Sequence, residues 1–169
     1  THMKKNTFPS FILFVCIVLS SSSSFSQGFN SISTPDGVNV IAVGNSGKLY
    51  RSTNSGNTWA SYTSLTDNLK SVFSLNDNVW ISSDNGKIFK TLKTNSSINV
   101  VNIGVTSTIN SVIFVNDNVG FLCGDGGVLY KSIDGGTSWT LSNSGIGTVK
   151  LNSISSSELE NGVTVGESG

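Results

Sequence analysis

Residues 124–139 read "GDGGVLYKSIDGGTSW", and the last eight of them place a tryptophan directly after a short acidic, glycine-rich turn. Residues 52–59, "STNSGNTW", share with residues 132–139 the pattern Ser-x-Asp/Asn-x-Gly-x-Ser/Thr-Trp. In this pattern the Asp or Asn can accept hydrogen bonds from backbone N–H groups about two residues further on, the glycine can adopt a positive φ, and the tryptophan can pack over the turn. We therefore expect a tight hairpin at each copy. The residues that form these two hairpins are Ser52, Asn54, Gly56, Thr58, Trp59, Ser132, Asp134, Gly136, Ser138 and Trp139.

Both copies belong to a longer repeat that runs through the chain. Four similar segments begin at positions 29, 69, 109 and 151 and read "FNSIS", "LKSVF", "INSVI" and "LNSIS". Each segment is followed by a polar turn, a short apolar stretch and a second turn, which reads "GNSG", "SDNG", "GDGG" or "GESG". A repeat of about 40 residues that consists of short strands and glycine turns is typical of a β-propeller blade.

The repeat predicts an all-β protein, a β-propeller of four-stranded antiparallel blades. In the third unit, alternating apolar and polar residues place strands at about 110–115, 120–123, 128–132 and 138–142. The fourth unit reaches only its glycine turn at residue 169. We therefore expect residues 27–169 to form about three and a half blades of an incomplete propeller, cut short of further blades. Open blade edges are expected to self-associate, because unpaired strand edges pair with other chains.

The second unit departs from the hairpin pattern. Its segment at 91–98, "TLKTNSSI", keeps the hydroxyl of Thr91 but has Lys93, Asn95 and Ile98 where the other units have Asp or Asn, Gly and Trp. We expect a looser hairpin there. Because one unit does without the tryptophan turn, we interpret this turn as a part of blade construction.

Residues 1–26 are predicted to be a helical signal peptide with a leading remnant. Thr1 and His2 precede the methionine and are interpreted as a cloning remnant or a frame extension. Two lysines, an apolar run at 11–19 and a serine-rich stretch follow, which is the order of regions in a secretory signal. The apolar run is too short to remain as a stable membrane anchor.

Small residues before the end of this segment place cleavage between Ser26 and Gln27. We therefore expect an exported protein that is periplasmic, attached to the cell surface or secreted. A lipoprotein signal at Cys16 is the weaker alternative, because Cys16 lies in the middle of the apolar run without a small residue before it.

The exported part has a slightly negative charge. Residues 27–169 hold seven lysines and Arg51 against ten acidic residues, a net charge of −2. Without a basic patch to neutralise phosphates, nucleic acid is not an expected partner. Cys123 is the one cysteine left after cleavage, so no intramolecular disulfide can form. It lies in the apolar segment "VGFLCG", and we expect a buried small hydrophobe rather than a reactive thiol.

Taken together, the repeats resemble the photosystem II assembly and stability factor-like propellers, within the wider sialidase/BNR propeller superfamily. The tryptophan turns resemble the Asp-box, or BNR repeat, of that superfamily. Residues 109–139, "INSVIFVNDNVGFLCGDGGVLYKSIDGGTSW", carry the nearest likeness, and the resemblance extends over residues 29–169. It implies a propeller that acts as a binding platform. The family includes photosystem assembly chaperones, and similar repeats occur in exported and cell-surface proteins of other bacteria.

We therefore expect a non-catalytic extracytoplasmic module that binds protein or glycan. The alternative is the N-terminal fragment of a larger secreted sialidase-type glycoside hydrolase with its catalytic residues downstream. Sialidases use three arginines to hold the substrate carboxylate, and this chain has only Arg51. Since Lys90 and Lys131 take its place in the other units, Arg51 is expected to be structural or solvent-facing.

No catalytic, cofactor-binding or metal-binding residue is predicted. The one histidine lies in the signal segment, so a Ser-His-Asp or Cys-His arrangement cannot form in the exported part. The "NDN" sequences at 76–78 and 116–118 lack the acidic spacing of an EF-hand and are interpreted as turns. Trp80 is expected to be a core residue.

Overall fold

The computed structural model of the chain describes residues 28–62, 65–94, 97–142, 145, 147–159 and 162–167. The predicted signal peptide and its cleavage site at Ser26 and Gln27 lie outside the described residues. Within the described part, no helix has the length and apolar character needed to cross a membrane. The elements there are β-strands and a single 3-10 turn.

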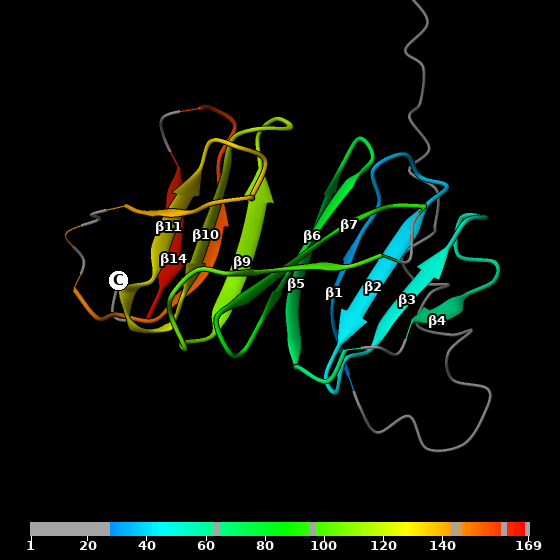
Figure 1. Ribbon diagram of the computed structural model, residues 1–169, viewed down its shortest axis with the longest axis horizontal. Coiled ribbons are helices and arrows are strands. Elements are labelled where there is room, and N and C mark those ends of the chain that lie inside the picture. Colours follow the sequence, from blue (N-terminus) through cyan, green and yellow to red (C-terminus); the bar gives the residue numbers. More distant parts are fainter. Residues whose placement is uncertain are drawn as a thin grey trace, which may run out of the picture.

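The strands form consecutive antiparallel sheets, each made from one repeat (Figure 1). Blade one contains β1 (Phe29–Ser33), β2 (Val40–Gly44), β3 (Leu49–Ser52) and β4 (Ala60–Tyr62), and blade two contains β5 (Leu69–Leu75), β6 (Asn78–Ser83), β7 (Lys87–Leu92) and β8 (Asn99–Asn102). Blade three contains β9 (Ile109–Phe114), β10 (Gly120–Gly124), the 3-10 turn η1 (Asp125–Gly127), β11 (Leu129–Ser132) and β12 (Thr140–Leu141), and blade four contains β13 (Leu151–Ser155) and β14 (Val163–Gly166).

The predicted fold class is therefore confirmed: the protein is all-β, with three four-stranded blades and a two-stranded fourth sheet. In the third unit, three strands agree with the prediction to within a residue. The fourth strand was expected at 138–142, but β12 spans only Thr140–Leu141. The reason is that the backbone N–H of Ser138 donates to the Asp134 carboxylate and is not available for the sheet.

The core lies between neighbouring blades. The second strands β2 and β10 are buried along their whole length, and each lies between two other strands of its blade. The inner strands β1, β5, β9 and β13 lie next to one another in chain order, so successive blades meet along them. Trp80 and Cys123 are both fully buried, which confirms that each is a core residue.

The looser hairpin expected in blade two falls partly outside the described residues, since Asn95 and Ser96 are not among them. At its described ends, the Thr91 hydroxyl donates to the Ser97 carbonyl over 2.8 Å. Blade two nevertheless has all four strands, and β7 pairs with β8 over four residues.

Candidate functional site

The tryptophan turn of blade three, residues 132–139, is held by a carboxylate. The Ser132 hydroxyl donates to the Asp134 carboxylate over 2.9 Å and accepts from the Gly136 N–H over 2.8 Å. The same carboxylate accepts from the backbone N–H groups of Thr137 and Ser138 and, over 2.5 Å, from the Ser138 hydroxyl. These hydrogen bonds, the Ser138 hydroxyl first, lower the pKa of Asp134 to about 2. The carboxylate is therefore a fixed anion within the turn.

The turn of blade one, residues 52–59, has the same arrangement with an amide. Asn54 accepts from the Ser52 hydroxyl and from the Thr58 N–H, and its Nδ2 donates to the Thr58 hydroxyl over 2.8 Å. The Gly56 N–H donates to the Ser52 hydroxyl over 2.8 Å. Trp59 Nε1 donates to the Gly56 carbonyl over 2.9 Å, which holds the indole against its own turn.

The turn of blade three also contacts blade two. Gly136 has a φ of 82°, and a Cβ there would lie 2.8 Å from Trp80 Nε1. Trp80 Nε1 donates to the Gly135 carbonyl over 3.0 Å. The indole of Trp80 is stacked on Phe114 with the ring centroids 3.6 Å apart, and half-buried Trp139 meets Phe114 edge-on. The residues of this turn thus join two blades.

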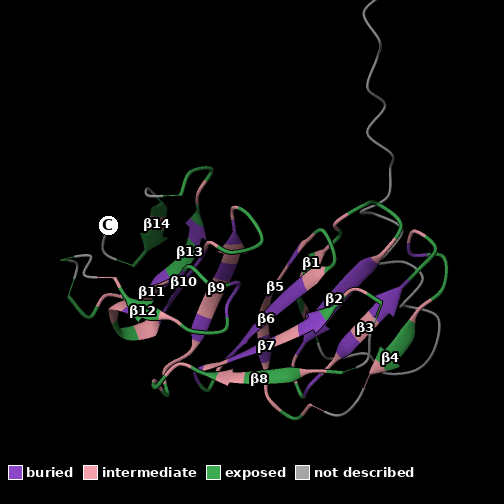
Figure 2. Cartoon of the chain, turned by 45° about the horizontal axis from the view of Figure 1, so that its top comes forward, coloured by how far each residue is buried: buried purple, intermediate pink, exposed green. Residues whose placement is uncertain are grey.

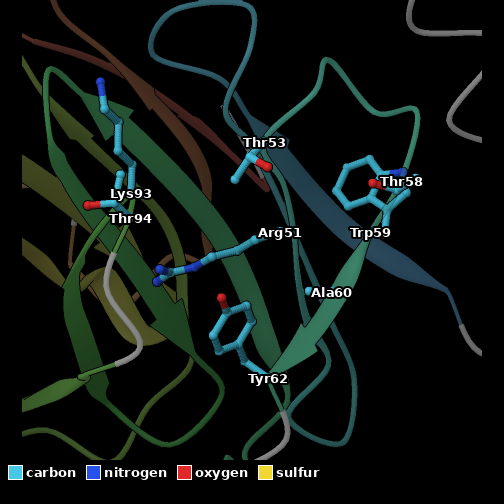
Figure 3. A pocket seen from close by; sticks show the side chains of 8 residues that line it. All are labelled: Arg51, Thr53, Thr58, Trp59, Ala60, Tyr62, Lys93 and Thr94. Atoms are coloured by element: carbon cyan, nitrogen blue, oxygen red, sulfur yellow. The ribbon is translucent and has the colours of Figure 1, made fainter.

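A pocket of about 180 Å³ lies beside the turn of blade one (Figure 3). Of the residues named from the sequence, Thr58 and Trp59 line it. Tyr62 and Arg51 come from blade one, and Lys93 comes from the turn after β7 in blade two. The other lining residues are Thr53, Ala60 and Thr94. The pocket is therefore formed where blades one and two meet.

Arg51 is held by the fold at the base of this pocket. Its side chain is only 4% exposed, and Nη1 and Nη2 donate to the Leu92 carbonyl and the Thr91 hydroxyl over 2.8 and 3.0 Å. The guanidinium lies 4.9 Å from the centre of the Tyr62 ring. Figure 3 shows the two side chains beside one another. Burial lowers the pKa of Arg51. Arg51 is thus structural and not solvent-facing, because its guanidinium donates to the backbone and to a side-chain hydroxyl at the end of β7.

Lys93 forms the rim of the pocket and is neutralised by two carboxylates. Its Nζ lies 3.1 Å from Asp36 and 3.0 Å from Asp77, and these contacts, Asp77 first, raise the pKa of Lys93. The Asn39 backbone N–H and, to a lesser extent, Lys93 lower the pKa of Asp36. The charges at this rim are therefore paired with one another.

The residues that line this pocket include no His, Cys, Asp or Glu. Burial raises the pKa of Cys123 to about 12, and Cys123 lies in the core away from the pocket. No group of three His, Cys, Asp or Glu side chains in the described ranges could hold a metal ion. What the pocket offers is two aromatic rings, several threonines and a paired lysine, which suit recognition by contact and hydrogen bonding.

Arg51, Tyr62 and Lys93 were not named as site residues from the sequence. A signal for Arg51 existed, because it is an arginine at a repeat position where Lys90 and Lys131 stand in the other units. Nothing in the sequence pairs it with blade two, since its two hydrogen-bond partners lie 40 and 41 residues away.

Comparisons with known proteins agree with this fold. No protein-family model and no curated protein sequence matches the chain. A solved structure of YCF48 bound to a D1 peptide matches with a TM-score of 0.66 and 17% identity, over 75% of this chain and 45% of that one. YCF48 from Cyanidioschyzon merolae matches with a TM-score of 0.68 and 18% identity, over 88% of this chain and 51% of that one. The computationally designed Ika4 protein matches with a TM-score of 0.72 and 9% identity, over 88% of this chain and 91% of that one.

The chain thus spans about half the length of the two YCF48 structures. All three identities are below 25%, so the likeness concerns the fold. It confirms the propeller fold that the sequence predicted and that the resemblance to photosystem II assembly factors implied.

Proposed function

We propose that this chain is a non-catalytic, extracytoplasmic propeller module that binds a polypeptide segment of another protein. The binding site is the pocket between blades one and two, with Trp59 and Tyr62 as its contact surface. The observation that carries the proposal is that two aromatic side chains line this pocket. Its two cations are bound by other residues of the chain: Arg51 donates to blade two, and Lys93 forms ion pairs with two carboxylates.

A polypeptide suits this surface for two reasons. Trp and Tyr offer a large apolar area with few rotatable bonds, so contact with an apolar side chain loses little conformational entropy. Thr53, Thr58 and Thr94 supply hydroxyl groups of the kind that pair with backbone amides. The structure of YCF48 bound to a D1 peptide supports the proposal by showing that a propeller of this fold can hold a peptide.

The state of the polar groups supports a non-catalytic role. The pKa values of Asp36 and Asp134 are lowered because their carboxylate oxygens accept hydrogen bonds from neighbouring residues in their own turns. Arg51, the one arginine of the chain, contacts Leu92 and Thr91, so the described residues do not offer an arginine cluster for a sugar carboxylate. The alternative, the N-terminal part of a sialidase-type hydrolase, therefore depends on residues other than those of this chain.

Glycan binding is the second candidate. Trp59 lies in the pocket next to the Thr58 and Thr53 side chains, and an indole face beside hydroxyl groups can hold a sugar ring by stacking and hydrogen bonding. An extracytoplasmic location rests on the order of charged, apolar and small residues in positions 1–26.

The test is a binding screen of the full-length chain against immobilised arrays of short peptides and of glycans. Trp59→Ala should weaken peptide binding at least about tenfold, as truncation of aromatic anchors does at interfaces. Leu141→Ala is the matched control, because Leu141 is an exposed apolar residue of blade three far from the pocket. Binding to glycans alone would show that the ligand is a glycan and not a polypeptide. Binding to neither array would contradict a binding site at this pocket.

A further inference from the structure

The rim of the pocket between blades one and two is where blade two departs from the repeat. Lys93 stands at the turn position that Asn54 has in blade one and Asp134 in blade three. Those two side chains accept hydrogen bonds from backbone N–H groups of their own turns. A lysine ammonium has donors only, so Lys93 cannot take this role. Its side chain pairs instead with carboxylates of two other turns.

This ammonium joins two blades at the rim. Its Nζ lies 3.1 Å from Asp36 Oδ2, in the turn after β1, and 3.0 Å from Asp77 Oδ1, in the turn after β5. The backbone N–H of Lys93 also donates to the Asp77 carbonyl over 2.8 Å. Asp77 is therefore held, by its backbone and by its side chain, beside a residue that lines the pocket.

The three charges of the rim differ in their exposure. The Lys93 side chain is 19% exposed, that of Asp36 is 32% exposed and that of Asp77 is 75% exposed. The Asp36 carboxylate also accepts from the backbone N–H groups of Val38 and Asn39. Two carboxylates against one ammonium leave the rim with one negative charge, and the Asp77 carboxylate is the part of it that solvent reaches best.

The second cation of the pocket is directed elsewhere. Arg51 is 4% exposed, and its guanidinium donates to the Leu92 carbonyl and the Thr91 hydroxyl of blade two. Figure 3 shows the Lys93 ammonium pointing away from this guanidinium. A ligand side chain at the rim therefore meets Asp77 before it meets Arg51.

Negative charge continues along this end of the blades beyond Asp77. Asp117, in the turn after β9 of blade three, accepts from Asn76 Nδ2 over 3.1 Å and also from Asn78 Nδ2. These two asparagines flank Asp77 in the chain. A side chain that approaches Asp77 thus finds a second carboxylate near the same turn.

The pocket is reached from the outer side of blade one. Ala60 and Tyr62, which line it, belong to β4, the outer strand of that blade. Figure 2 shows β4 mainly in the colour of exposed residues. A segment of another protein can therefore lie along β4 and extend to the rim.

We infer that the polypeptide segment bound at this pocket is basic, and that it presents a lysine or arginine side chain to Asp77 next to an apolar side chain on Trp59 and Tyr62. The inference rests on the proposed function and names the class of segment that the same site takes. In an extended segment, side chains two residues apart point the same way about 7 Å from one another, so one segment can make both contacts. An acidic side chain at the same place is disfavoured, because it meets a like charge.

Calorimetric titration of the full-length chain with three sets of short blocked peptides tests this inference. The sets share an apolar or aromatic central residue and differ only in having Lys, Gln or Glu two residues away. We expect the Lys set to bind about threefold to fivefold more tightly than the Gln set, as for an exposed ion pair, and the Glu set to bind least tightly. The difference should vanish at about 1 M salt, where charges are screened within about 3 Å.

Two variants of the rim should act in opposite directions. Asp77→Asn should abolish the preference for Lys over Gln, whereas Lys93→Gln, which removes the ammonium from between the two carboxylates, should increase it. If the ion pairs served the fold alone, both variants would weaken the three sets equally. Glu167→Gln is the matched control, because Glu167 is also an exposed carboxylate paired with a lysine, Lys150, but lies at the end of blade four.

The outcomes separate this inference from the proposed function. Equal binding of the three sets that Trp59→Ala weakens would overturn the basic segment and leave the peptide site in place. A preference for the Glu set, or a loss of preference in Glu167→Gln as large as in Asp77→Asn, would also overturn the inference. Binding of none of the sets would contradict both proposals.

Discussion

Replacing Gly136 by alanine tests the contact between the turn of blade three and the core of blade two. Gly136 has a φ of 82°, and its Cβ would lie 2.8 Å from Trp80 Nε1 and 3.1 Å from the Phe114 ring. Gly104 is the matched control, because its φ is 83° and a Cβ there would meet nothing within 4 Å. Both substitutions introduce the same backbone strain, and only one introduces a contact.

The expected costs follow from these two contributions. An alanine in the left-handed region costs about 1–2 kcal/mol, and this is the whole effect expected for Gly104→Ala. Gly136→Ala adds overpacking against the stacked rings, about 1–3 kcal/mol, and weakens the hydrogen bond from Trp80 to the Gly135 carbonyl. We therefore expect Gly136→Ala to lower the free energy of unfolding by about 2 kcal/mol more than Gly104→Ala does.

Urea unfolding followed by tryptophan fluorescence and by circular dichroism measures this difference. The fluorescence of Trp80 also reports on its own surroundings, so Gly136→Ala should shift the native emission while Gly104→Ala leaves it unchanged. If the two variants unfold within about 0.5 kcal/mol of each other, the turn of blade three does not pack on Trp80 as described.

Three further predictions concern other parts of the chain. Intact mass of the exported protein should place a new N-terminus at Gln27, and recovery of the uncleaved chain from a cell that processes other exported proteins would contradict the predicted signal. Because the pKa of Asp134 is lowered to about 2 from its ordinary 3.8, its contribution to stability is present above about pH 4 and is lost as the pH falls toward 2. Asp134→Asn should remove this pH dependence and keep the stability at pH 7 within about 0.5 kcal/mol, since Asn54 forms the same turn in blade one; a large loss at pH 7 would show that the charge itself is needed. With its pKa raised to about 12 by burial, Cys123 in the processed chain should resist thiol reagents at pH 8 until urea unfolds the protein, and rapid native labelling would contradict its place in the core.

The blade starts could be predicted because the repeat is local and nearly regular. The repeat segments were placed at positions 29, 69, 109 and 151, and β1, β5, β9 and β13 begin at those positions. Apolar alternation and glycine turns act over about ten residues, so a single sequence contains all the information that they need.

The pocket could not be predicted, because its residues act together only after two blades pack. Thr58 and Trp59 were named for their part in a turn, and nothing in the sequence indicates that they line a pocket with Lys93 of the next unit. From the sequence, Arg51 was interpreted as structural or solvent-facing, because it is the single arginine and lysines take its place in the other units. Its hydrogen bond to the Thr91 hydroxyl became visible only in the folded chain.

The sequence by itself thus determined the all-β repeat, the order of strands in each blade and the chemistry of the turns, because these depend on alternation and on hydrogen bonds between residues close in the chain. Only the tertiary structure decided which surfaces meet. Trp80 donates to Gly135 across 55 residues, and Arg51 donates to Thr91 across 40. Contacts between sheets depend on how whole blades pack, and the order of residues within one blade does not specify its neighbour.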